Sequence, residues 1–230
     1  MNIAVVLAAG SGSRIGADVP KQFLPVKGKL IIEYTLESFE AHPLIDAILI
    51  VCKNEYISKL KELVERRSYK KILKIVAGGK ERYQSSMCAI KECREENDIL
   101  LFHDAARPLV SHRIITDCIK ALDKYDAATV AVETTDTIYI ADAQGKILDI
   151  PNRKSLRNAQ TPQCFKCAVI KEAYDKALED SGFTPTDDCS VVHKYLPDAS
   201  IFIVSGDAAN FKITYPEDIE LFERMIEHRL

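Results

Sequence analysis

The sequence predicts an α/β fold, a mostly parallel sheet with helices on both faces. Short runs rich in β-branched residues alternate with longer segments of helical periodicity, which is typical of parallel sheets wrapped by helices. The predicted strands are apolar throughout instead of alternating, as expected for strands that are buried on both faces. The 230 residues, 47% of them apolar, can bury a substantial core, and we expect one domain, residues 1–230.

The first part of the chain contains most of this alternation. The expected strands are, in chain order, Ile3–Leu7, Ala47–Val51, Ile72–Val76, Ile99–Phe102 and Ala128–Val132. The expected helices between them are Leu30–Ala41, Tyr56–Arg66, Tyr83–Glu95 and Arg113–Leu122. Ligands of open α/β sheets bind beyond the carboxyl ends of the strands, so the polar clusters that follow these strands are the candidate site.

The segment Thr135–Ile150, TDTIYIADAQGKILDI, breaks the alternation. It consists of two alternating runs separated by Ala-Gln-Gly, which predicts a β-hairpin with its turn near Gly145. We expect this hairpin to protrude as an arm at about residues 135–157. The elements expected after it are helices around Lys166–Ser181 and Asp188–Tyr195, a strand at Ser200–Val204, and a last helix from Pro216, where proline suits the first turn.

Composition excludes several classes of protein. The formal net charge of −3 gives no sign of a nucleic-acid-binding face. No apolar stretch approaches the roughly 18 residues needed to span a bilayer, and Ile3 to Ala9 is too short for a signal peptide, so we expect a cytoplasmic protein without membrane contact. Seven cysteines without framework spacing predict reduced thiols. The C-x-x-C at Cys164 and Cys167 lacks a second pair at zinc spacing, which favours a packing or turn role.

A glycine-rich stretch, LAAGSGSRIGADVPKQF, follows the first predicted strand. Its small residues let the backbone approach a ligand closely and turn N–H groups toward phosphate oxygens. The spacing of its three glycines does not match a dinucleotide fingerprint, and no G-K-[ST] follows as a Walker A loop requires. What remains is a glycine loop that carries its own cations, Arg14 and Lys21, with Pro20 stiffening the approach to the lysine. The alternative is a plain glycine turn with surface cations.

A second cluster, HDAARP, follows the strand at Ile99–Phe102. A carboxylate at a strand end, with an arginine three residues later, suits a divalent metal and the phosphates that the metal neutralises. Asp104 is therefore the candidate metal ligand, with Arg107 beside it. We expect His103 to be a structural histidine.

Three further motifs complete the set. GGKERYQSS is a glycine turn before a helix, where amide groups and the Ser85 hydroxyl can hold a base or a sugar. IPNRKSLRNAQTPQ, with TDDC downstream, forms a polar cluster. In NFKITYPED, Lys212 lies on a predicted apolar strand between Phe211 and Ile213, where it either extends to solvent or binds an anion.

Taken in order, these motifs, with the DTI of the hairpin, resemble the 2-C-methyl-D-erythritol 4-phosphate cytidylyltransferase family and its ribitol-5-phosphate cytidylyltransferase relatives. The resemblance spans nearly the whole chain. It implies a Rossmann-like nucleotidyltransferase sheet with a protruding β-arm that builds a homodimer. It also implies that a polyol phosphate attacks the α-phosphorus of CTP in the presence of Mg²⁺, which gives a CDP-polyol and pyrophosphate.

The resemblance further implies roles for individual residues. Arg14 and Lys21 would bind the triphosphate and stabilise its transition state, and Lys212 would join them at the α-phosphate. The positions implied to hold the nucleotide are Ala8, Ala9, Gly10, Gly79, Ser85, Asp104 and Arg107, with Asp104 also the metal-associated acid. The positions implied for the polyol-phosphate pocket, part of which the family draws from the partner subunit's arm, are Thr137, Arg153, Thr161 and Thr186.

The motifs leave the acceptor open between two branches. Asn152-Arg153 and TDDCSVVHKYLP resemble the ribitol relatives, whereas HDAARP resembles the methylerythritol branch. We favour methylerythritol phosphate and isoprenoid precursor synthesis, with CDP-ribitol for surface polymers as the alternative. A sugar-1-phosphate nucleotidyltransferase shares the opening loop but would not need the arm. A non-catalytic nucleotide-binding module on the same fold would need fewer cations than this chain carries.

Overall fold

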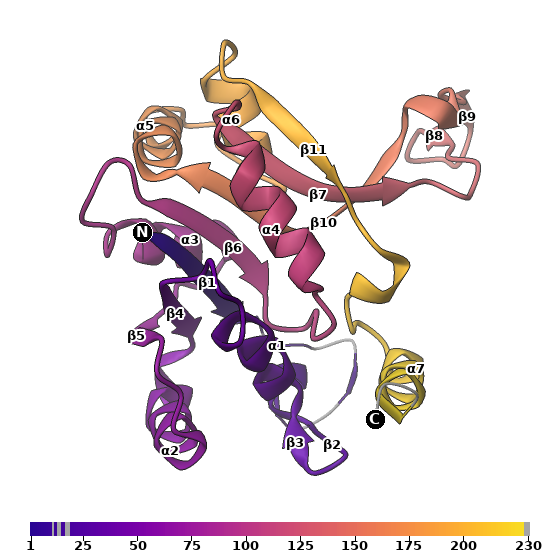
Figure 1. The fold of residues 1–230 in the computed structure, drawn as a ribbon. Helices are drawn as coiled ribbons and strands as arrows, with labels where there is room; N and C mark the ends of the chain where they lie inside the picture. The colour runs from indigo at the N-terminus through magenta and orange to yellow at the C-terminus, as the bar shows by residue number, and fades with distance from the viewer. Residues whose placement is uncertain (11, 13–14, 17–18, 228–230) are drawn as a thin grey trace.

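The computed structural model describes residues 1–10, 12, 15–16 and 19–227 and contains a seven-stranded sheet (Figure 1). Its strand order is β11-β7-β10-β6-β1-β4-β5, and only β10 runs antiparallel to its neighbours. The strands are β1 (Asn2–Ala8), β4 (Ala47–Cys52), β5 (Ile72–Ala77), β6 (Ile99–Asp104), β7 (Ala127–Glu133), β10 (Arg157–Lys166) and β11 (Ile201–Ser205). The predicted mostly parallel sheet is confirmed.

Helices cover both faces of this sheet. Successive residues of a strand point to opposite faces, so each strand contributes to two cores. Val6 and Ile50 face a core shared with α1, α2 and α4, whereas Val5 and Leu49 face a core shared with α3, α5 and α6. The helices are α1 (Ile31–Glu40), α2 (Ile57–Arg67), α3 (Arg82–Ile90), α4 (His112–Ala121), α5 (Cys167–Leu178), α6 (Asp188–Tyr195) and α7 (Pro216–Glu227). Among the described residues, none of the helices has the length and apolar character of a membrane span.

Shorter elements complete the description. A small hairpin of β2 (Pro25–Val26) and β3 (Lys29–Leu30) packs with α7 in a separate apolar cluster that contains Val26 and Phe222. The 3₁₀ helices are η2 (Lys21–Phe23), η3 (Asn54–Tyr56), η4 (Arg153–Ser155) and η5 (Ala208–Asn210). The last three residues of the glycine-rich stretch form η2, and the small hairpin follows it, so Lys21 and Gln22 of η2 are the part of this segment that lines the cavity described below.

Strand β10 is the main element that sequence reasoning missed. The polar composition of the segment before Lys166 is typical of a site motif, and a Pro within it argues against a central strand. In the structure β10 pairs with both β6 and β7, and an irregularity in its register between Ala159 and Gln163 accommodates Pro162. The strand forms because β6 and β7 pair with it on either side, and the sequence pattern of β10 itself does not reveal this pairing.

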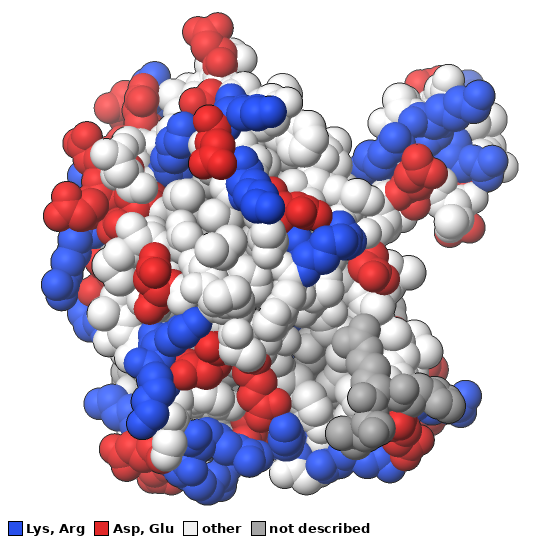
Figure 2. Space-filling model, viewed as in Figure 1, with Lys and Arg blue, Asp and Glu red and all other residues white. Residues whose placement is uncertain are grey.

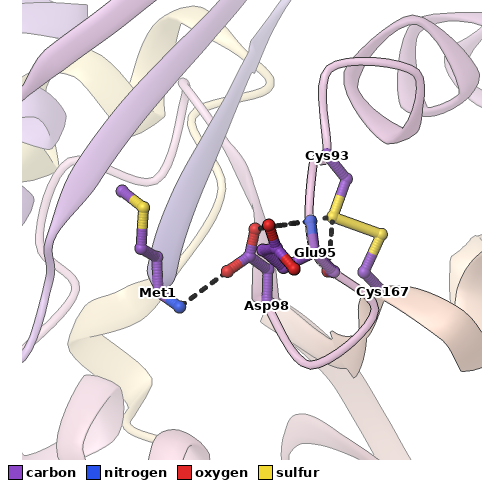
Figure 3. The surroundings of a disulfide bond; sticks show 5 residues. All are labelled: Met1, Cys93, Glu95, Asp98 and Cys167. Atoms are coloured by element: carbon purple, nitrogen blue, oxygen red, sulfur yellow. Dashed lines mark hydrogen bonds and ion pairs between the residues drawn. A yellow bond between two sulfur atoms is a disulfide. The ribbon is translucent and has the colours of Figure 1, made fainter.

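The expectation that every cysteine is reduced is wrong, because a disulfide joins Cys93 to Cys167 (Figure 3). The helix expected to extend to Glu95 ends at Ile90, and the turn after it brings Cys93 to the first residue of α5. Asp98, close to this disulfide, accepts a hydrogen bond from the N-terminal ammonium of Met1 at 2.6 Å. The two cysteines are 74 residues apart in the sequence, so spacing rules did not detect the pair.

The predicted arm is present as a hairpin of β8 (Ile140–Ala141) and β9 (Ile147–Asp149), shorter than expected. Gly145 adopts a φ of 86° at its turn, a conformation that favours glycine. Figure 1 shows the hairpin standing away from the sheet, and Figure 2 shows it as a separate lobe. Its exposed apolar side chains are Ile138, Tyr139, Ile140, Ile147, Leu148 and Ile150.

Candidate active site

A cavity of about 280 Å³ lies at the carboxyl ends of β1 and β6. The chain continues from β1 to β4 on one side of β1, while β6 lies on its other side, so the strand order reverses at this point. Such a switch point is where open α/β sheets bind ligands. The predicted site residues that line the cavity are Ala9, Gly10, Lys21, Gly79, Ser85, Asp104 and Lys212.

The loop after β1 is held in place by Gln22, a buried residue whose amide donates to the carbonyls of Ala8 (2.6 Å) and Gly10 (3.0 Å). Gly12 adopts a φ of 68°, and a Cβ at this position would lie 2.9 Å from the backbone nitrogen of Lys21. A glycine is therefore needed for the loop to pass the lysine. Gln22 belongs to the glycine-rich stretch LAAGSGSRIGADVPKQF, but the sequence of that stretch did not reveal its role.

Two lysines from opposite ends of the chain meet at the cavity. Lys21 in η2 donates from Nζ to the carbonyl oxygen of Ile213, the residue after Lys212. The amide of Ile213 in turn donates to the carbonyl of Ala106 at 2.9 Å. Lys212 lies in an irregular segment between η5 and α7, so the prediction that it lies on a strand is wrong. Arg14, the third predicted cation, lies outside the described residues.

Asp104 is the centre of the charge arrangement. Its Oδ2 lies 2.8 Å from Lys212 Nζ and 3.5 Å from Arg107 Nε, and its Oδ1 lies 3.9 Å from Arg82 Nε. Burial opposes ionisation of this carboxyl, but the charges of Lys212, Arg82 and Arg107 outweigh it and hold the pKa of Asp104 well below its usual range. One carboxylate therefore faces three cations, which leaves an excess of positive charge for an anionic ligand.

The backbone of Asp104 is supported from behind by a neutral histidine. The Thr161 hydroxyl accepts from the Asp104 amide at 3.1 Å and contacts His103 Nδ1 at 2.9 Å, while His103 Nε2 lies 3.0 Å from the Arg107 carbonyl oxygen. Burial lowers the pKa of His103 to about 4, so the ring is neutral at pH 7. Thr161 thus lies beneath Asp104, and His103 has the structural surroundings expected for it.

The opposite wall of the cavity is formed by the turn before α3. A Cβ on Gly78 would lie 2.6 Å from the Ser85 hydroxyl and 2.9 Å from the Ala9 Cβ, and a Cβ on Gly79 would collide with Gln84. The glycines therefore let the β1 loop and the first turn of α3 approach each other closely. The result is a narrow slot lined by backbone and by the Ser85 hydroxyl.

Three of the residues implied for the acceptor pocket lie elsewhere. Thr137 and Arg153 are exposed at the base of the arm, where Arg153 donates to the Thr135 carbonyl at 2.9 Å. Thr186 is exposed just before α6. The described part of one chain therefore brings Ala9, Gly10, Lys21, Gly79, Ser85, Asp104 and Lys212 to the cavity but does not place these three side chains in it.

Asn210 is a supporting residue that sequence reasoning did not single out. Its side chain is fully buried and donates to the Thr161 carbonyl at 2.8 Å and to Gln160 Oε1 at 3.2 Å. Its own carbonyl accepts from Arg107 Nη1 at 2.8 Å. Asn210 therefore fastens the segment that carries Lys212 to β10. It stands in the NFKITYPED motif, but only the contacts show what it does.

The family model described as IspD, 2-C-methyl-D-erythritol 4-phosphate cytidylyltransferase, matches residues 2–228. The chain belongs to this family. A 2-C-methyl-D-erythritol 4-phosphate cytidylyltransferase of Thermobifida fusca is 41% identical over 97% of this chain and 92% of that protein. As a member of the family, the chain is a nucleotidyltransferase of the cytidylyltransferase class.

Two further comparisons place the IspD-family chain among known proteins. The crystal structure of 4-diphosphocytidyl-2C-methyl-D-erythritol synthase from Anaerococcus prevotii matches with a TM-score of 0.87 and 30% identity, and the match covers 99% of this chain and 98% of that one. The bifunctional ribulose 5-phosphate reductase/CDP-ribitol pyrophosphorylase Bcs1 of Haemophilus influenzae is 40% identical over 99% of this chain, which spans 48% of that protein. The chain therefore has close relatives that are named for two different activities.

Proposed function

We propose that this protein transfers the cytidylyl group of CTP to 2-C-methyl-D-erythritol 4-phosphate, with release of pyrophosphate, in isoprenoid precursor synthesis. The observation that carries the proposal is the convergence of Lys21, Lys212 and the Asp104 cluster on a cavity at the switch point of the sheet. Family membership and the Thermobifida fusca relative support the choice of reaction and acceptor. Because the reaction uses CTP and a phosphorylated metabolite, we also propose a cytoplasmic location.

The proposed chemistry needs cations more than it needs a general base. The attacking group is a phosphate monoester anion, which requires no deprotonation by the protein. Lys21 is held by the Ile213 carbonyl and Lys212 by Asp104, so both ammonium groups are positioned before the substrate binds. Donors that are fixed in advance stabilise developing charge without a cost of reorganisation. Lys21 and Lys212, with Arg14, would therefore stabilise the charge that develops at the α-phosphate.

Asp104 fits the role of a ligand for Mg²⁺ that arrives with the nucleotide. The described residues contain no group of three or more His, Cys, Asp or Glu that could hold a metal by themselves. Mg²⁺ is commonly bound by one or two carboxylates together with substrate phosphates and waters. Asp104, ionised because its pKa is lowered, supplies one such carboxylate. The metal would neutralise charge on the triphosphate, while Arg107 holds the Asp104 carboxylate.

The slot between the β1 loop and α3 is proposed to hold the cytidine. Ala9 and Gly10 line one side and Gly79 and Ser85 the other, while the Ala8 carbonyl behind them accepts from Gln22. The slot leaves little room for side chains, which suits a flat base recognised by backbone groups. In this arrangement the triphosphate points from the slot toward Lys21 and Lys212.

We propose that residues 1–230 form one domain whose arm, at about residues 135–157, builds a homodimer. The arm exposes six large apolar side chains, among them Tyr139 at 57% and Leu148 at 61%, on a hairpin that stands off the sheet. Exposed apolar surface of this kind marks an interaction site. A partner's arm at the cavity would bring its Thr137 and Arg153 to the acceptor, whereas in this chain Thr161 supports Asp104 from beneath and Thr186 lies outside the cavity.

Ribitol 5-phosphate is the second candidate acceptor, with CDP-ribitol as its product. The observation in its favour is the Haemophilus influenzae relative, which is 40% identical over 99% of this chain. The sequence Pro151-Asn152-Arg153 at the end of the arm also resembles that branch. The two acceptors would use the same nucleotide site.

Pyrophosphate release with CTP and Mg²⁺ tests both candidates in one assay. Methylerythritol 4-phosphate, ribitol 5-phosphate and erythritol 4-phosphate are compared at equal concentrations, with CTP alone as the blank. We expect the highest kcat/KM with methylerythritol 4-phosphate. A higher kcat/KM with ribitol 5-phosphate would transfer the assignment to the second candidate, and no release with any acceptor would refute the proposed reaction.

A further inference from the structure

Arg82, the first residue of α3, lies on the wall of the cavity between two carboxylates. Its Nη1 lies 2.6 Å from Oδ2 of Asp188, and its Nε lies 3.9 Å from Oδ1 of Asp104. The contact with Asp188 is thus close, whereas that with Asp104 is loose. Its remaining amino group, Nη2, is buried and has no hydrogen-bond partner among the described residues. Such donors are rare in folded proteins, and because Arg82 lines the cavity, a turn of the guanidinium toward a ligand oxygen there would supply the missing partner.

Asp188 is placed to hold this guanidinium. It is the first residue of α6, and its side chain is completely inaccessible to solvent. Its second oxygen, Oδ1, accepts from the Tyr174 hydroxyl of α5 at 2.7 Å, and its amide donates to Gln163 of β10 at 3.2 Å. A carboxylate in the protein interior is costly unless it is paired, and among the described residues Arg82 is the cation that pairs with it.

The arrangement has a consequence for Asp104. Without Asp188, the nearest carboxylate to the Arg82 guanidinium would be Asp104, which already binds Lys212 and Arg107. Arg82 would then close on Asp104, and its charge would be lost to a ligand in the cavity. Because Asp188 and Tyr174 lie behind the wall of the cavity, they keep the guanidinium away from Asp104 without occupying the site.

We propose that Arg82 is a further cation of the nucleotide site that binds the triphosphate, and that Asp188 and Tyr174 are positioning residues that hold it there; the role in turnover rests on the proposed cytidylyl transfer. The second aspartate of the TDDC motif thereby acts on the nucleotide from α6. The ligand chemistry is a polyphosphate, and the nucleoside part of CTP lies outside this contact.

Binding of CTP and of cytidine separates this role from general stability. The full-length protein is titrated with CTP by calorimetry and with cytidine, which lacks phosphates, by nuclear magnetic resonance. In Asp188→Asn we expect the Kd for CTP to rise about tenfold, as the loss of one charge-assisted hydrogen bond implies, while the Kd for cytidine stays unchanged. Equal changes for both ligands, or none for either, would overturn the proposal.

A double variant tests whether the pair is merely structural. Removing one partner of a buried ion pair is strongly destabilising, whereas removing both is often nearly neutral. We therefore expect Arg82→Gln/Asp188→Asn to regain most of the melting temperature lost in Asp188→Asn but not the affinity for CTP or kcat. Recovery of the melting temperature, the affinity for CTP and kcat together would refute the proposed role.

Tyr174→Phe tests the second positioning residue, because it removes only the hydroxyl. This variant should fold and should bind CTP more weakly than the wild type, with a smaller loss than in Asp188→Asn. Unchanged CTP binding would count against the role of Tyr174.

Glu33 provides a matched control. It is also a buried carboxylate paired with an arginine, Arg67, but it lies on α1 away from the cavity. Glu33→Gln should lower the melting temperature and leave CTP binding and kcat unchanged.

Two outcomes separate this proposal from the proposed function. If the wild type binds CTP through Arg82 but turns over no acceptor, only the proposed function is refuted. Turnover by the wild type, with CTP binding unaffected in Asp188→Asn, would refute the role of Asp188 alone.

Discussion

The buried imidazole of His103 predicts a specific loss of stability in mild acid. His103 is fully buried beneath Asp104, and its pKa is lowered by burial from 6.5 to about 4. The unfolded chain therefore binds a proton at this ring between about pH 6.5 and pH 4, while the folded chain does not. The free energy of unfolding must fall as the pH decreases through this window, and the contribution levels off below it.

The size of the effect follows from the two pKa values. Between pH 7.5 and pH 5.0 the linkage relation gives a loss of about 2 kcal/mol from His103 alone. The lowered pKa of His42, also caused mainly by burial, adds a change of the same sign. A variant without the His103 ring is therefore needed to isolate its share.

His103→Gln is a suitable variant because its uncharged amide offers both a donor group and an acceptor oxygen. These match the Arg107 carbonyl and the Thr161 hydroxyl that the ring contacts. Urea unfolding of both proteins from pH 7.5 to pH 5.0 gives the free energy of unfolding at each pH. We expect the wild type to lose about 2 kcal/mol more than the variant over this range. Parallel curves would refute the assignment of a neutral, buried His103.

Three further predictions concern the site and the arm. Lys21→Ala should reduce pyrophosphate release by about 10²-fold with a smaller change in the Kd for CTP, because its ammonium is assigned to the transition state; unchanged release would refute that role. Asn210→Ala should lower the free energy of unfolding by about 1–3 kcal/mol in urea, since it removes the side-chain donor to the Thr161 carbonyl and one of the donors to Gln160, and a loss below the error of the measurement would contradict this. If the proposed homodimer forms through the arm, Leu148→Asp should convert it to monomer in analytical ultracentrifugation; a wild type that sediments as a monomer at micromolar concentration would refute the proposed dimer.

Much of the fold is encoded locally and was predictable. The helix expected around Asp188–Tyr195 has these bounds in the structure, where Asp187 caps its first turn by accepting from the Ser190 amide. The hairpin turn at Gly145 was predictable because a turn residue separated two alternating runs. The order of the nucleotide motifs along the chain was likewise visible, since each motif follows a strand.

The parallel sheet, the place of the glycine loop along the chain and the family could be predicted from the sequence, because periodicity, turn chemistry and motif order are properties of neighbouring residues. Three features become visible only in the folded protein: the contacts of Asp104 with Lys212 and Arg82, the pairing of Cys93 with Cys167, and the central strand at residues 157–166. These contacts join residues far apart in the chain. Their energies depend on burial and on charges that no local pattern contains, so they exist only once the sheet has assembled.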